Sequence, residues 1–220
     1  MKTQIIKKYK ATAPNTVQQR ALRIIKGIAT FRDRFVPKHE ELVKLIEELR
    51  SMGCTIVFTT GVWDLIHIGH ADYIQNGKDA AAKFYPNTDH VIMVVGVDTD
   101  ELTKRRKGPN RPIVPQEERF EMLGHLRAVD ILTPQYEHDS LFKIVDHDVR
   151  VISQSTKDLP EMKRMKVRCA RIVNLPPQAE TSTTARVRRL SLDGATNVLL
   201  TIEKGLEATL KEVRDEISKK

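Results

Sequence analysis

Two histidines stand three residues apart in the segment Gly61-Val-Trp-Asp-Leu-Ile-His67-Ile-Gly-His70, where an apolar run ends and a helix is expected to begin. Residues three apart on a helix share a face, so both imidazoles should point the same way. The helix N-terminus adds unpaired amides and a positive dipole end, which favour an anion. Gly61 lets the backbone approach a phosphate, and Gly69 leaves the surface between the rings without a side chain. This combination suits a phosphoryl group undergoing in-line displacement.

The same pattern has two other interpretations. Histidines at this spacing could ligate a metal, but no third ligand with suitable spacing is evident nearby. They could also be surface histidines with no function. Other segments of the sequence are needed to choose between these interpretations.

The elements around the histidines alternate between two kinds of pattern. Short apolar runs alternate with helical periodicity, which is typical of βαβ units with active-site loops at the carboxyl ends of parallel strands. We therefore expect an α/β fold with a Rossmann-like, doubly wound parallel sheet of five strands and helical N- and C-terminal extensions. The expected strands are 55–60, 91–97, 130–133, 149–153 and 169–173, and the expected helices are 68–84, 116–126, 140–146 and 159–165.

Helical spacing extends beyond this region at both ends. Apolar residues within 17–35 recur at helical spacing, and a second helix follows Pro37 and stops at Gly53. An apolar stripe in 199–217 predicts a helix packed on the chain's own core, with a dimer seam as the alternative. We expect a basic helical extension over 1–52, a catalytic domain over 53–192, and a packed C-terminal helix over 193–220.

The net charge of +8 is concentrated near the N-terminus. Residues 1–35 hold nine basic side chains and one acidic side chain, so the other residues sum to zero. This concentration favours a solvated helix face or a partner-docking arm, with nucleic-acid binding as the less favoured alternative. The two cysteines, Cys54 and Cys169, form no CxxC pattern and predict buried thiols, with a single disulfide bond between them as the alternative. With no membrane-length apolar run and no signal-peptide pattern, we expect a cytoplasmic protein.

Three segments together resemble the HxGH nucleotidyltransferase superfamily, whose members are cytidylyltransferase-like. The resemblance covers about residues 55–190 and is strongest to adenylyltransferases that act on heptose 1-phosphate. The chain also resembles, less strongly, the glycerol-3-phosphate and ethanolamine-phosphate cytidylyltransferases. The segments are TTGVWDLIHIGH, then GVDTD with KRRKGPNRPI and EER, and finally Thr181-Ser-Thr-Thr184 with Arg186 and Arg188.

The resemblance implies a role for each matching residue. His67 and His70 would stabilise the transferring α-phosphate, and Lys107, on a loop after the second strand, would neutralise phosphate charge. Arg119 would hold the acceptor or the triphosphate, and Asp64 would also contact substrate. No metal would be bound by the protein itself, and Mg²⁺ would come with the nucleotide phosphates. The implied nucleotide contacts are Thr60, Gly61, Val62, Gly69, Lys104, Ser182, Thr183, Thr184 and Arg188.

The expected reaction transfers a nucleoside monophosphate, AMP favoured, from ATP to a phosphorylated small molecule such as a sugar phosphate, and releases pyrophosphate. The acceptor phosphate is ionised near neutral pH, so the protein needs no Ser or Cys nucleophile and works by alignment and charge stabilisation. The expected partners are the triphosphate and the acceptor, without a membrane or nucleic acid. Formation of a homodimer is left as an alternative to a monomer.

Two departures and three rival functions accompany this interpretation. Heptose-type enzymes carry a glycine-rich stretch after the fourth strand, where residues 152–158 here contain no glycine, which puts base and acceptor in doubt. Trp63 stands where phenylalanine is usual, and we interpret it as a conservative swap. The rivals are a CTP-dependent cytidylyltransferase acting on an alcohol phosphate, an aminoacyl-tRNA synthetase fragment, and a non-catalytic nucleotide- or RNA-binding module. The short chain and the missing lysine loop argue against the synthetase.

Overall fold

The computed structural model describes residues 16–154, 169–178, 191–192, 194–196, 198–207, 209 and 211. The chain divides into two compact units, Met1–Ala179 and Glu180–Lys220. The strands of the first unit are β1 (Thr55–Gly61), β2 (Val91–Asp98), β3 (Ile131–Gln135), β4 (Val149–Ser153) and β5 (Arg171–Leu175). Its helices are α2 (Val17–Ile25), α3 (Phe31–Arg34), α4 (His39–Ser51), α5 (Ile68–Phe84), α6 (Asp100–Lys107), α7 (Gln116–Gly124) and α8 (Ser140–Ile144).

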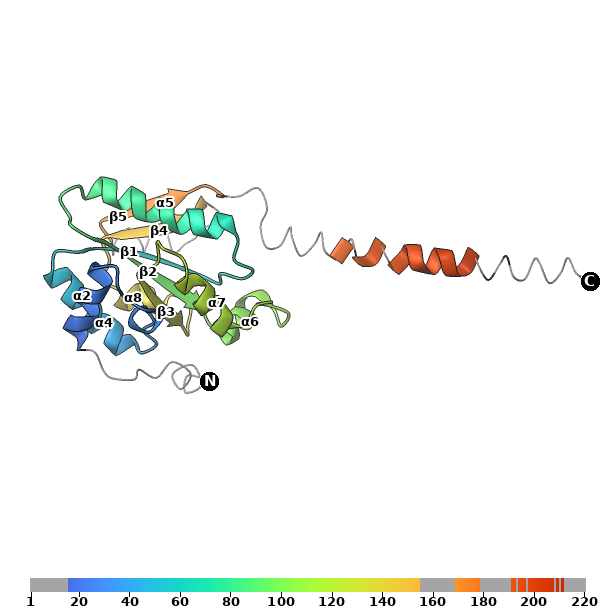
Figure 1. The fold of residues 1–220 in the computed structure, drawn as a ribbon, viewed down its shortest axis with the longest axis horizontal. Helices are drawn as coiled ribbons and strands as arrows, with labels where there is room; N and C mark the ends of the chain where they lie inside the picture. Colours follow the sequence, from blue (N-terminus) through green and yellow to red (C-terminus); the bar gives the residue numbers. More distant parts are fainter. Residues whose placement is uncertain are drawn as a thin grey trace, which may run out of the picture. The chain divides into compact units, whose positions relative to one another are not determined.

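The five strands form one parallel sheet in the order β3-β2-β1-β4-β5 (Figure 1). β1 lies at the centre, and the chain winds outward from it in both directions. This order brings the carboxyl ends of β1 and β4 together at the point where the winding reverses, which is where open α/β sheets bind ligands. The predicted Rossmann-like sheet of five parallel strands is confirmed.

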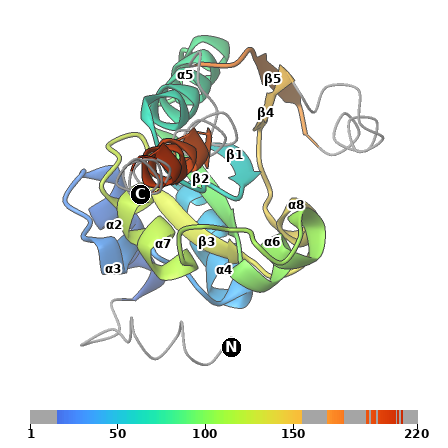
Figure 2. The same ribbon diagram turned by 90° about the vertical axis from the view of Figure 1, so that its right-hand side faces the viewer.

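Helices cover both faces of the sheet (Figure 2). The side chains of α2, α4 and α8 pack with one face, together with Ile56 and Phe58 of β1. The side chains of α5 and α7 pack with the other face, together with Val57 of β1. Burial on both sides explains why the strands read as continuous apolar runs without alternation.

The N-terminal apolar stretch forms two helices where its spacing suggests one. α2 ends at Ile25, and Gly27 follows with a φ of 68°, a left-handed conformation that glycine adopts without strain. The chain then turns into the short helix α3. The break interrupts the burial: Ala21 and Ile24 are in the core, Ile28 is 57% exposed, and Phe35 is buried again.

Arginines of this segment bind it to the rest of the first unit. The Arg20 guanidinium donates to the carbonyl oxygen of Phe35 at 2.6 Å. The Arg34 guanidinium donates to the carbonyl oxygen of Val129 at 2.9 Å, close to the start of β3. Both arginines belong to the basic segment, so part of its charge serves packing within the chain.

The basic run after β2 is helical, which corrects its expected placement on a loop. Thr99 caps α6 by accepting the Leu102 amide at 3.2 Å, and the acidic residues Asp100 and Glu101 occupy the first turn. The basic run forms the last turn, where cations suit the helix dipole. Gly108, with a φ of 97°, ends the helix.

Several expectations concern residues that the structure does not describe. The helix expected at 159–165 and the motif 181–184 with Arg188 lie outside the described residues. The described residues from 191 to 211 are helical. Whether this helix packs on the domain, forms a dimer seam, or begins where the predicted domain boundary falls stays a prediction.

Both cysteines are free thiols; Cys54 is buried as expected, whereas Cys169 is only half-buried. Across the described residues, no helix is both long and apolar enough to cross a membrane.

His147 should make the protein sensitive to acid. The side chain is 4% exposed, and burial lowers its pKa from 6.5 to about 4, although a hydrogen bond of 2.6 Å to the Val145 carbonyl opposes this shift. The unfolded chain therefore binds the proton more readily than the folded chain between these two pH values. The contribution of neutral His147 is complete above pH 6.5 and is lost as the pH falls toward 4.

Urea unfolding measured at pH 7 and pH 4 checks this prediction. His147→Leu should reduce the acid-induced loss of unfolding free energy by about 3 kcal/mol. His125→Leu, a change at an exposed histidine, should keep the wild-type loss. An identical loss in His147→Leu and wild type would contradict the assignment.

Candidate active site

The two histidines form a reciprocal cap at the start of α5. His67 is the N-cap residue, and its Nδ1 accepts the Gly69 amide at 3.1 Å. His70 Nδ1 accepts the His67 amide at 3.4 Å. The ring centroids lie 4.1 Å apart. The HxGH spacing thus works as a capping box in which imidazoles replace the usual hydroxyl and carboxylate.

The cap determines the tautomer of each ring. An Nδ1 atom that accepts an amide proton carries none itself, so each neutral imidazole has its proton on Nε2. Burial lowers the pKa of His70 to about 4, helped by the charges of His67 and Lys107 and opposed by Asp64. At neutral pH His70 is therefore an uncharged hydrogen-bond donor.

The loop from β1 to α5 is held by Trp63. Its indole Nε1 donates to the Gly96 carbonyl of β2 at 2.9 Å, and its ring packs against that of His70 with centroids 5.6 Å apart. Trp63 itself has a φ of 58°. A Cβ atom on Gly61 would lie 3.1 Å from the indole. Gly61 thus makes room for Trp63, a reason that the sequence did not suggest.

Trp63 is consequently more than a substitute for phenylalanine. Trp63→Phe should keep the aromatic packing but leave the Gly96 carbonyl without its donor, lowering the unfolding free energy by about 1–2 kcal/mol. Trp63→Ala should cost more, about 3–5 kcal/mol, because it also opens a cavity beside His70. Urea titrations of both variants check this order of unfolding free energies. Equal stability of Trp63→Phe and wild type would contradict a role for the indole N–H.

The basic residues of α6 separate into two groups. Arg106 pairs with the buried carboxylate of Asp98 at 2.7 Å, and Arg105 pairs with Glu137 at 3.0 Å. Lys104 and Lys107 form no ion pair with any described residue. Partial burial lowers the pKa of Lys107, with Asp98 opposing the shift. The charge of Lys107 also lowers the pKa of His70, so the lysine lies within electrostatic range of that histidine.

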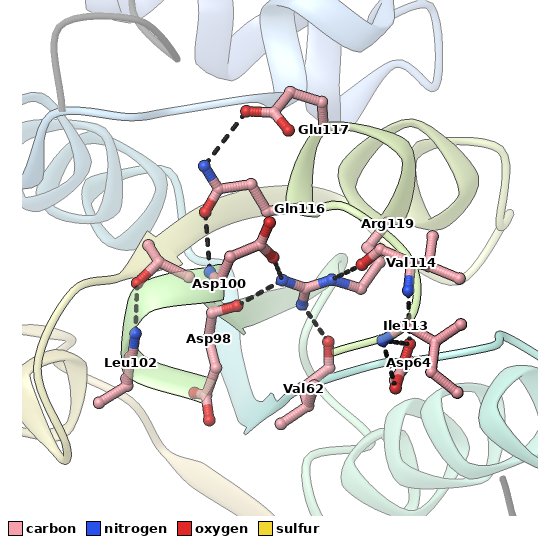
Figure 3. A network of polar contacts seen from close by, with 11 residues as sticks. Val62, Asp64, Asp98, Asp100, Leu102, Ile113, Val114, Gln116, Glu117 and Arg119 are labelled. Atoms are coloured by element: carbon pink, nitrogen blue, oxygen red, sulfur yellow. Dashed lines mark hydrogen bonds and ion pairs between the residues drawn. The ribbon is translucent and has the colours of Figure 1, made fainter. Parts of the chain in front are cut away.

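Arg119 connects the ends of the first two strands (Figure 3). Its side chain is 0% exposed. Nη1 donates to the Val62 carbonyl, and Nη2 donates to the Asp98 carbonyl at 2.9 Å and to the Asp100 carboxylate at 2.6 Å. Nε donates to the Val114 carbonyl at 3.0 Å. This burial does not fit the expected contact with substrate and indicates a positioning residue.

Asp64 is likewise occupied by the protein. It is 5% exposed and pairs with Arg111 at 3.0 Å. It also accepts the amides of Ile113 and Val114 at 3.0–3.1 Å (Figure 3). Asp64 therefore fastens the loop before α7 to the loop after β1. The expected substrate contact is not what this geometry supports.

The structure brings together part of the predicted site. Thr60 and Gly61 end β1, and Val62 follows them toward the histidine cap. Gly69 lies inside the cap, and Lys107 is within electrostatic range of His70. No contact places Lys104 with them. Within the described residues there is no group of three His, Cys, Asp or Glu side chains that could hold a metal. Sequence reasoning missed Arg111, and it also missed Arg150, a charge inside the apolar β4 run that should have drawn notice.

The family model of cytidylyltransferase-like proteins matches residues 58–189. The chain belongs to this family. The match extends from β1 through the histidine cap and past β5, so it includes the segments that carried the predicted resemblance. Membership in this family agrees with the resemblance that the three sequence segments predict.

Two curated relatives share the name bifunctional protein HldE. The chain is 36% identical over 122 residues to that of a Nitratiruptor species, covering 54% of this chain and 24% of the relative. It is 37% identical over 125 residues to that of a Helicobacter pylori strain, covering 57% of this chain and 25% of the relative. The matched part is thus about a quarter of these relatives.

Among solved structures, the chain is similar to a lipopolysaccharide core biosynthesis protein of Thermoplasma volcanium. The identity is 24% and the TM-score is 0.43. The match covers 55% of this chain and 95% of that protein.

Proposed function

We propose that the chain transfers AMP from ATP to the phosphate of a small phosphorylated molecule, such as a sugar phosphate, and releases pyrophosphate. An acceptor phosphate oxygen attacks the α-phosphorus, and the bond to the bridging oxygen of the β-phosphate breaks. The observation that carries the proposal is the paired imidazole cap, which places two Nε2–H donors beside a helix N-terminus. The resemblance to heptose 1-phosphate adenylyltransferases and the HldE relatives favour ATP and a sugar phosphate.

Each residue has a distinct part in this mechanism. The Nε2–H groups of His67 and His70 stabilise charge on the α-phosphate, and Lys107 neutralises the departing phosphates. Trp63 and Arg119 keep the two strand ends in position for this contact. Because Nδ1 of neutral His70 accepts the His67 amide, its proton is on Nε2, from which it can donate to the α-phosphate.

Mg²⁺ would arrive as part of the triphosphate complex. The carboxylates of Asp64 and Asp98 already accept protein donors, so neither supplies a ready protein ligand. Magnesium commonly keeps several waters and binds through substrate phosphates, which fits this set of residues. When bound with the triphosphate, the metal would neutralise part of its negative charge.

A panel of nucleoside triphosphates against phosphorylated acceptors, followed by pyrophosphate release, tests the proposal. We expect turnover with ATP and a sugar 1-phosphate, and none in His70→Ala. Turnover only with CTP and an alcohol phosphate would replace the proposal with the cytidylyltransferase alternative. The absence of glycine in 152–158, where heptose-type enzymes have a glycine-rich stretch, is the observation that favours this alternative. No pyrophosphate from any pair, with the chain folded, would refute transfer chemistry.

A further inference from the structure

Arg150 is a buried cation that forms no ion pair with any residue that the structure describes. It is the second residue of β4 and is 4% exposed. Its Nη2 donates to the Thr60 hydroxyl oxygen at 2.9 Å, and its guanidinium carbon lies 4.3 Å from the ring centre of Phe58. Its other donors, Nε and Nη1, have no hydrogen-bond partner in the part of the chain that the structure describes.

Such a group is costly to keep in a core. Placing an unpaired charge in a protein interior costs several kcal/mol even after relaxation. Burial lowers the pKa of Arg150 to about 10, and the neighbouring Tyr73, Asp139 and Cys169 oppose the shift. The side chain nevertheless remains charged near neutral pH. A methionine or leucine would fill the same apolar run without this cost.

The position of Arg150 suggests what could offset the cost. β1 and β4 are neighbouring parallel strands (Figure 1). Phe58 and Arg150 are partners in their register. Thr60 lies two residues further along β1, directly before Gly61 and the loop to the histidine cap. Since Thr60 accepts from Arg150, its own hydroxyl proton must point to another acceptor.

We propose that Arg150 holds a substrate phosphate beside the carboxyl end of β1, through its unpartnered donors and through the Thr60 hydroxyl that it orients. This inference rests on the proposed function, because it needs a phosphorylated substrate. The phosphate belongs to the nucleotide or to the acceptor. Either one would supply the negative charge and the acceptor oxygens that the described residues lack, as guanidinium groups commonly find in phosphate.

The test combines ligand affinity with stability of the free chain. Arg150→Met should weaken binding of the phosphate-bearing ligand about 10-fold or more, measured by calorimetry with Mg-ATP and separately with inorganic phosphate. The free variant should be at least as stable as wild type in urea, because an uncompensated charge is removed. Arg150→Lys should recover part of the affinity, and Thr60→Val should weaken binding by a smaller factor.

The two ligands distinguish the source of the phosphate. A loss confined to Mg-ATP assigns the position to the nucleotide, and a loss confined to inorganic phosphate assigns it to the acceptor. The control Arg171→Met changes an exposed arginine on the neighbouring strand β5 and should bind both ligands as wild type does.

Four results would overturn the inference. Unchanged affinities in Arg150→Met would mean that the buried donors serve no ligand, and a destabilised or unfolded Arg150→Met would mean a structural role. Turnover in the pyrophosphate assay separates the two proposals. If the wild type turns over and Arg150→Met turns over equally fast, only the proposed role of Arg150 is refuted. A wild-type chain that binds neither ligand and turns nothing over refutes both.

Discussion

Replacing either His67 or His70 with alanine should lower kcat by about 100-fold or more while the KM for the nucleotide changes by about threefold or less. The reason is that an Nε2–H donor binds the α-phosphate more strongly as charge builds on it, so its loss affects the transition state more than the bound substrate. Steady-state pyrophosphate release with the nucleotide found in the panel measures both constants.

The histidines also cap α5, and the controls must separate capping from catalysis. His67→Asn keeps a good N-cap residue but lacks the Nε2 donor. It should therefore retain wild-type stability and show the same loss of kcat as His67→Ala. His67→Ala should additionally lose about 1 kcal/mol of stability. His125→Ala, at an exposed histidine, should behave as wild type. Near-normal turnover in His67→Ala would defeat the assignment.

Arg119→Met should lower the free energy of unfolding by about 3–5 kcal/mol. The substitution removes a fully buried guanidinium and leaves the Asp100 carboxylate and three backbone carbonyls without that donor. Because two of these carbonyls, at Val62 and Asp98, follow or end β1 and β2, activity should fall as well. Urea titration of the full chain gives the stability change.

Variants at the same site separate a positioning role from substrate binding. Arg119→Lys keeps the charge but not the forked geometry, so it should recover only part of the stability. The exposed Arg127→Met should have no effect. If Arg119→Met were as stable as wild type yet inactive, the residue would contact substrate as the family resemblance implied, and its structural role would be refuted.

The sequence predicted the elements whose periodicity was strong and local. α5 begins and ends at the expected residues, as does β4, because apolar spacing and terminal residues set these bounds. α6 was missed for the opposite reason. Its eight residues are mostly charged, so no apolar stripe marked it, and only the Thr99 cap and the acidic first turn could have indicated a helix.

For the site, the sequence alone determined the paired histidines, the glycine between them and their place after a buried strand, because these depend on neighbouring residues. Only the tertiary structure decided which charges stay available. Arg119 and Asp64 looked like substrate ligands in sequence, but folding surrounds them with carbonyls, amides and Arg111 from distant segments. Arg150 looked like an ordinary strand residue, yet folding buries it with donors unpaired among the described residues. The physical reason is that a polar group's role depends on the partners that the fold places around it, and those partners come from far along the chain.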